Sequence, residues 1–340
     1  MTSRDLVIRA LNHEPVERIP RDLWYAPGVA ARRADEVAEI ELRFPRDIVP
    51  PEIDYPPGRP GKAAHKRKGP YTDAWGCTWS VTAAGALEAV DQPPLDGEAS
   101  LRQYQPPMEL IEKIRRARVN QSCNTTPRFV LAWSQTQPFQ RLQWLRGRQA
   151  VLAGLDSGNG ALADLLQRLH EFSCSEMKTW AATEVDGVAF TDSWGDADGL
   201  VVNLELWRER FKPLYRDYCQ ILHDQDKFAF FRSGGNIAAI LPELIEIGVD
   251  AVYADLDRMD LDRLAEAYRG QVTFWAGLGP QITRPAVRRE EIAEAVGRIR
   301  RALDFGRGGI IAQCEWPPDL SFRTIAALLE PWTTPMAMHA

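Results

Sequence analysis

Short apolar runs alternate with longer stretches of helical period along most of this chain. The runs are rich in Val, Ile, Phe and Trp, which favour buried strands. Eight of them fit strands, at residues 19–25, 47–50, 129–134, 187–191, 227–231, 251–254, 273–276 and 309–312. Strands that alternate with helices in this way predict a closed (β/α)8 TIM barrel. A doubly wound open sheet would more often carry a Gly-x-Gly-x-x-Gly turn, and none follows these strands.

An insertion of about seventy residues, at roughly 51–125, separates the second and third predicted strands. Its first part, residues 50–60, is rich in proline. Residues 71–82 and 86–90 then predict a β-hairpin around Ala83-Ala-Gly85. Insertions of this length in a barrel usually cap the catalytic face or build an interface. We therefore expect one barrel domain over residues 1–340 with a β-hairpin insertion between its second and third strands.

Composition narrows the classes of function. The net charge of −6 gives no global basic field, so we expect no nucleic-acid partner. No apolar stretch approaches the ~18 residues of a membrane span, and the first residues predict an amphipathic helix rather than a signal sequence. The five cysteines are odd in number and form no Cys-x-x-Cys pair. This usage favours a reduced compartment, and we expect a cytoplasmic protein.

The carboxyl ends of barrel strands meet at one face, where polar residues that follow different strands share a pocket. In chain order the candidates are Trp24, Tyr25, Asp47, Trp133, Asp192, Trp194, Arg232, Asn236, Asp255, Gln281, Cys314 and Glu315. Carboxylates, one arginine and several indoles suit a mid-sized organic substrate with a flat or apolar part. We predict catalytic roles for Asp192, Asp255 and Asp47, and substrate contacts for the other nine. A lone carboxylate is more often a helix cap, and the strand-end position strengthens the case for Asp192 and Asp255.

The sequence offers a poor set of metal ligands at this face. None of the five histidines follows a predicted strand. A catalytic zinc site usually has three N, S or O ligands, and Cys314 would have to work with carboxylates alone. An all-oxygen Mg²⁺ site stays open. No Gly-x-Ser-x-Gly elbow or Cys/His pair indicates a nucleophilic triad. We expect no tightly bound cofactor and no zinc.

Several segments resemble the uroporphyrinogen decarboxylase superfamily, which includes corrinoid-linked methyltransferases. Residues 1–20 are similar to its N-terminal helix and Arg-x-Pro turn. Phe190-Thr-Asp-Ser-Trp-Gly195 resembles the Asp-Asp-Trp-Gly strand end of the methyltransferase-like branch. Residues 240–250 resemble the helix and turn that lead to the sixth strand, and residues 273–277 and 314–319 resemble the last two strands. The resemblance covers nearly the whole chain in order and implies the barrel.

The chain departs from both known chemistries of that superfamily. Its decarboxylases carry two arginines after the first strand, where this chain has Tyr25 and Val29. Its thiol-activating methyltransferases hold zinc with His-x-Cys after the fifth strand and a Cys after the eighth. Here the first pair reads Arg232-Ser-Gly234, and only Cys314 is kept. The resemblance therefore implies neither the tetrapyrrole clamp nor the zinc.

Three functions stay open. In the first, Asp192 or Asp255 protonates a leaving heteroatom while a methyl or other one-carbon group moves from a small substrate to a corrinoid protein or a pterin. In the second, the chain decarboxylates a carboxylic acid or a porphyrinogen-like substrate, with Arg232 on a carboxylate and Asp47 stabilising a protonated intermediate. In the third, the barrel binds a tetrapyrrole, a corrinoid or a partner without catalysis. A corrinoid-protein partner and a homodimer are implied by the resemblance alone.

Overall fold

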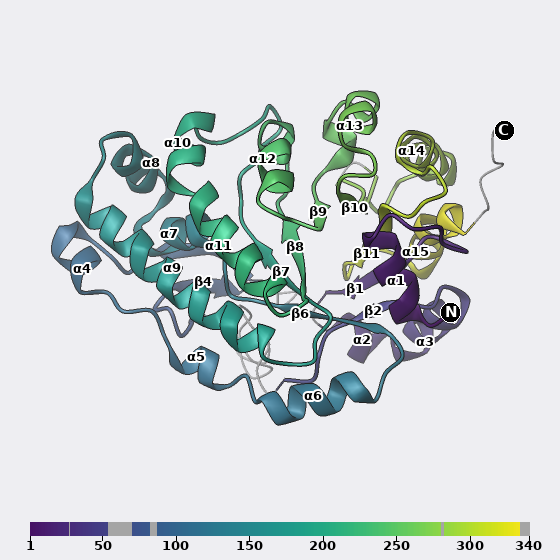
Figure 1. Ribbon diagram of the computed structural model, residues 1–340, viewed down its shortest axis with the longest axis horizontal. Helices are drawn as coiled ribbons and strands as arrows, with labels where there is room; N and C mark the ends of the chain where they lie inside the picture. The colour runs from purple at the N-terminus through teal and green to yellow at the C-terminus, as the bar shows by residue number, and fades with distance from the viewer. Residues whose placement is uncertain (27, 54–69, 82–86, 280–281, 334–340) are drawn as a thin grey trace.

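Eight parallel strands form a nearly closed barrel in the computed structural model, which describes residues 1–26, 28–53, 70–81, 87–279 and 282–333 (Figure 1). The strands are β1 (Arg21–Tyr25), β2 (Ile48–Val49), β6 (Phe129–Trp133), β7 (Gly187–Thr191), β8 (Phe228–Arg232), β9 (Ala251–Tyr253), β10 (Thr273–Ala276) and β11 (Ile310–Trp316). Their order is β1-β11-β10-β9-β8-β7-β6-β2. The Asp47 N–H donates to the Arg21 carbonyl at 2.8 Å, which joins the two ends. The predicted (β/α)8 barrel is confirmed.

Helices cover the outside of the barrel (Figure 1). They are α2 (Val29–Arg32), α3 (Ala34–Arg43), α7 (Pro138–Arg146), α8 (Arg148–Asp156), α9 (Gly160–Ala181), α10 (Leu204–Arg210), α11 (Lys212–His223), α12 (Leu241–Glu246), α13 (Leu261–Tyr268), α14 (Arg289–Leu303) and α15 (Phe322–Leu329). In α9, Leu162, Leu165 and Leu169 are buried at the three- and four-residue spacing of an amphipathic helix. Within the described ranges, no helix combines the length and the apolar character that a membrane crossing requires.

The N-terminal helix α1 (Ser3–Leu11) closes the amino end of the barrel. Its Val7 and Leu11 belong to the interior cluster that includes Ile48 of β2 and Phe129 of β6. A TIM barrel keeps its chemistry at the opposite end, where the strands reach their carboxyl termini. The closed amino end leaves that face for ligands.

The last strand is longer than expected. The apolar pattern predicted residues 309–312, whereas β11 extends to Trp316 because β1 pairs with it from Ala312 to Trp316. The register places Leu23 opposite Cys314 and Trp24 opposite Glu315. Both predicted site residues therefore lie within a strand rather than in the loop behind it.

The insertion forms a small antiparallel sheet of β3 (Tyr71–Thr72), β4 (Thr78–Val81) and β5 (Leu87–Gln92). The short helices α4 (Gly97–Gln103), α5 (Glu109–Glu112) and α6 (Arg116–Asn124) follow it. The predicted hairpin is thus present, and its turn at residues 83–85 lies outside the described residues. Trp75 is buried edge-on against Phe172 of α9, and the guanidinium of Arg141 lies 3.9 Å from its ring. These contacts dock the insertion on the barrel helices.

The loops after β7 and β8 touch through their backbones. The Asn236 N–H donates to the Asp196 carbonyl at 2.8 Å. A Cβ atom on Gly235 would lie 2.3 Å from the carbonyl carbon of Gly195, and the φ of Gly235 is +74°. Only glycine meets both requirements without strain. This backbone contact between Gly235 and Gly195 fixes the loop that begins directly after Arg232.

We expect Gly235→Ala to lower the free energy of unfolding by about 2 kcal/mol or more, because a methyl group adds both a left-handed strain and an overlap. The matched control is Gly234→Ala, since a Cβ there meets no heavy atom within 4 Å and φ is not positive. Urea unfolding of both variants measures the difference. Equal stability of the two variants would contradict the requirement for glycine at position 235.

Candidate active site

A cavity of about 370 Å³ lies at the carboxyl end of the barrel. It is lined by Arg232, Tyr253, Asp255, Leu278, Thr283, Gln313, Cys314, Glu315, Pro317 and Leu328. Two cavities of about 420 and 410 Å³ lie instead among the outer helices. The mouth cavity brings together four of the residues predicted from the sequence, namely Arg232, Asp255, Cys314 and Glu315.

Arg232, the last residue of β8, supplies the positive charge of this cavity. Its guanidinium carbon lies 4.9 Å from the ring centre of Tyr253 and 5.2 Å from that of Trp24. Aromatic faces stabilise a cation at such distances. Its Nε is buried without a hydrogen-bond partner among the described residues, and so is Nε2 of Gln313. Two unpaired donors at one cavity indicate a site for acceptor oxygens of a ligand.

Three tryptophans form an aromatic cluster on the interior face of the barrel. Ring centres of Trp24 lie 5.0 Å from Trp133 and 5.2 Å from Trp275. The indoles of Trp24 and Trp275 both donate to Oδ2 of Asp22, at 2.7 and 2.9 Å. Burial raises the pKa of Asp22 to about 7 despite these two bonds. Sequence reasoning missed Asp22, although strand alternation places it on the same face as Trp24.

Asp255 is the predicted catalytic carboxylate that lines the cavity. One of its oxygens accepts the Gly235 N–H at 3.1 Å and lies 3.4 Å from Arg258. It is half-buried, whereas Glu315 on the neighbouring wall is exposed. The loop that contains Gly235 thus fixes the position of Asp255 relative to Arg232.

Asp192 caps a helix instead of lining the cavity. Its oxygens accept the N–H groups of Phe139 and Gln140 at 2.8 and 2.7 Å, at the start of α7. The Tyr215 hydroxyl donates to it at 2.6 Å. Burial raises its pKa to about 6. A carboxylate at a helix N-terminus satisfies N–H groups that have no partner within the helix.

Asp47 lies at the amino end of the barrel, so its placement in the mouth was wrong. It precedes β2 rather than following it. Arg18 donates to both of its oxygens, at 2.7 and 2.6 Å, and Ser3 of α1 donates at 2.6 Å. The carboxylate therefore anchors the closed end of the barrel. The strand expected at residues 47–50 also begins with Asp47, so the residue belongs to the amino end in both the expected and the observed strand.

Three further candidates do not line the cavity, and one cannot be placed. The ring of Trp194 is fully buried beside α7. The Tyr25 hydroxyl donates to Glu41 of α3 at 2.7 Å, on the outer face of β1. Oδ1 of Asn236 accepts a backbone N–H two residues ahead, at 3.1 Å. Gln281 lies outside the described residues.

Cys314 is buried in the wall of the cavity, and burial raises the pKa of its thiol to about 12. Within the described ranges, one group of three His, Cys, Asp or Glu side chains is close enough to hold a metal. It lies on α9 and α11 and does not include Cys314. Within the described part of the mouth, the cation that lines the cavity is Arg232.

Comparison with known proteins identifies a shared fold. No family model matches the sequence. No curated protein matches it either. A methyltransferase from Methanosarcina mazei is similar in structure, with a TM-score of 0.72 over 98% of both chains and 13% sequence identity. This likeness shows that the chain and that enzyme have the same barrel architecture.

We expect Asp22→Asn to remove a pH dependence of stability. The folded state holds the Asp22 proton up to a pKa of about 7, whereas the unfolded chain releases it near 4. The folded state therefore binds more protons between these values, and its stability falls as pH rises from about 4 to about 7. Urea midpoints should fall more steeply over this range in the native chain than in the variant.

A surface variant, Asp262→Asn, controls for the general effect of removing a carboxylate, because this side chain is exposed on α13. It should keep the native pH dependence. A native stability that rises over the same range relative to Asp22→Asn would contradict the raised pKa.

Proposed function

We propose that this barrel is an enzyme that transfers a methyl or other one-carbon group from a small substrate to a corrinoid protein or a pterin. The fold shared with a methyltransferase supports this proposal. So does the resemblance of residues 190–195 to the methyltransferase-like branch of the uroporphyrinogen decarboxylase superfamily. A barrel fold hosts many reactions, so the proposal depends on the chemistry of the mouth.

The observation that carries the proposal is the pair of unpaired donors on Arg232 and Gln313 at one cavity with Asp255. A substrate oxyanion or carbonyl accepts hydrogen bonds from these donors. Its apolar part packs on Tyr253. This leaves the end that carries the methyl group near Asp255 and open to a second reactant.

In the transfer step, the bond between the methyl carbon and its heteroatom breaks, and the bonding electrons stay on the heteroatom. The acceptor supplies the electron pair for the new bond to the methyl carbon. Asp255 passes a proton from solvent to the heteroatom, which leaves as a neutral group. Arg232 holds the substrate throughout the step through the hydrogen bonds of its guanidinium.

Decarboxylation is the second candidate, because the same two donors fit a substrate carboxylate. Asp47 cannot stabilise an intermediate at the mouth, since it lies at the other end of the barrel. Asp22, with a pKa of about 7, is the interior acid that would protonate the carbanion left by CO₂.

The two candidates give different products. The purified chain is incubated with methylated amines, thiols, ethers and acids, with free cob(I)alamin as the methyl acceptor, and methylcobalamin is followed by absorbance. CO₂ release is measured in parallel without cobalamin. Methylcobalamin formation that is lost in Asp255→Asn supports methyl transfer. CO₂ release that needs no cobalamin supports decarboxylation and contradicts methyl transfer.

We expect Arg232→Gln to raise KM for an anionic substrate by about 10- to 100-fold, the loss that accompanies removal of one hydrogen bond to a charged group. The change in kcat should be smaller, because Arg232 binds the substrate before and during the reaction. The control is Arg263→Gln, an exposed position on α13. An unchanged KM in Arg232→Gln would contradict the proposed anion site.

A further inference from the structure

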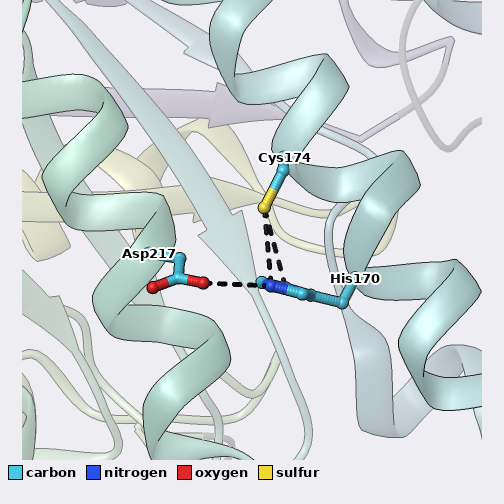
Figure 2. Close-up of side chains that lie close together, drawn as sticks. All are labelled: His170, Cys174 and Asp217. Atoms are coloured by element: carbon cyan, nitrogen blue, oxygen red, sulfur yellow. Dashed lines mark hydrogen bonds and ion pairs between the residues drawn. The ribbon is translucent and has the colours of Figure 1, made fainter.

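Three potential metal ligands come together on the outer helices of the barrel. His170 and Cys174 lie one helical turn apart on α9, and Asp217 lies on the neighbouring α11 (Figure 2). One ligand atom from each residue lies within 4.8 Å of the other two. Residues at i and i+4 share one face of a helix, so α9 presents both of its ligands to α11.

Two of the three distances between these atoms are close to the edges of a zinc tetrahedron. Zinc bond lengths give edges of about 3.6 Å between nitrogen and sulfur and about 3.4 Å between nitrogen and oxygen. Here Nε2 of His170 lies 3.6 Å from Sγ of Cys174 and 3.1 Å from Oδ2 of Asp217. Sγ is almost equally far from Nδ1, at 3.7 Å, so binding requires the Cys174 side chain to rotate until Sγ lies on the Nε2 side of the ring.

The other ring nitrogen of His170 has the partner that a metal-binding histidine needs. Nδ1 lies 3.1 Å from the hydroxyl of Tyr218, which is fully buried. With a proton on Nδ1, this pair holds the imidazole plane and leaves the Nε2 lone pair free for a cation. Without metal, Nε2 carries the proton and donates to Asp217, while the Tyr218 hydroxyl donates to Nδ1.

Charge and access also fit a divalent cation. A thiolate and a carboxylate neutralise the two charges of Zn²⁺, which lowers the cost of holding it at a half-buried position. The Asp217 side chain is 56% exposed and that of His170 only 11%. The cation therefore enters from the solvent side, and a water molecule takes the fourth position.

We propose that His170, Cys174 and Asp217 form a Zn²⁺ site that joins α9 to α11. A mixed N, S and O ligand set favours zinc over Mg²⁺ or Ca²⁺, which prefer oxygen. The site lies outside the barrel mouth and does not depend on the chemistry there. Zinc bound to the folded chain raises its stability by mass action.

The test is a zinc titration of the full chain after treatment with a chelator and desalting. We expect one Zn²⁺ per chain and a higher thermal midpoint with zinc. Cys174→Ser and Asp217→Asn should each weaken binding at least tenfold, the scale on which ligand-shell changes act. Asp217 is exposed, so its variant is expected to fold even if Cys174→Ser does not.

Cys314→Ser is the matched control, because it alters a buried thiol at the barrel mouth. It should leave zinc binding unchanged. Co²⁺ in place of zinc should give a thiolate-to-metal charge-transfer band that Cys174→Ser abolishes. No zinc binding by the native chain, full binding by Cys174→Ser, or loss of zinc in Cys314→Ser would each overturn the proposal.

Discussion

The two-residue period of the strands decides which side chains reach the interior of this barrel. In β8 and β9 it places Arg232 and Tyr253 on the inside, above the interior layer of Phe230 and Ala251. In β11 it places Gln313 and Glu315 above Ile311. A shift of one residue in any strand would exchange these groups for outward-facing ones. Strand register therefore decides which side chains line the mouth, and the residue types at those positions then decide its chemistry.

The barrel interior is polar near the mouth and apolar below it. The indoles of Trp24, Trp133 and Trp275 lie between these two layers. Trp24 offers a ring face to Arg232 and an N–H group to Asp22. It thereby contacts a cation and a buried acid at once. The rings of Trp24 and Tyr253 lower the free-energy cost of burying Arg232. The indole N–H groups of Trp24 and Trp275 do the same for Asp22. In this polar layer, Nε of Arg232 and Nε2 of Gln313 have no hydrogen-bond partner among the described residues and are free to bind a ligand.

The loops and outer helices hold this layer in place. Asp192 joins the end of β7 to the start of α7 through backbone N–H groups. The contact of Gly235 with Gly195 fixes the next loop and, with it, Asp255. Asp192 thus has a structural role at the end of β7 and does not line the cavity. The proposed zinc site would add one more link between neighbouring outer helices.

The sequence by itself determined the barrel, because eight apolar runs separated by helical segments leave few other folds. It also placed Arg232, Asp255, Cys314 and Glu315 at the mouth, since residues at strand ends converge there. It did not show the partners of Asp47, because Ser3 and Arg18 reach this carboxylate only in the folded barrel. Nor could it assign Asp192 to a helix cap or Asp22 to a buried indole pair. Those outcomes depend on partners far away in the chain, such as Phe139 and Trp275, which only the tertiary structure brings within hydrogen-bond distance.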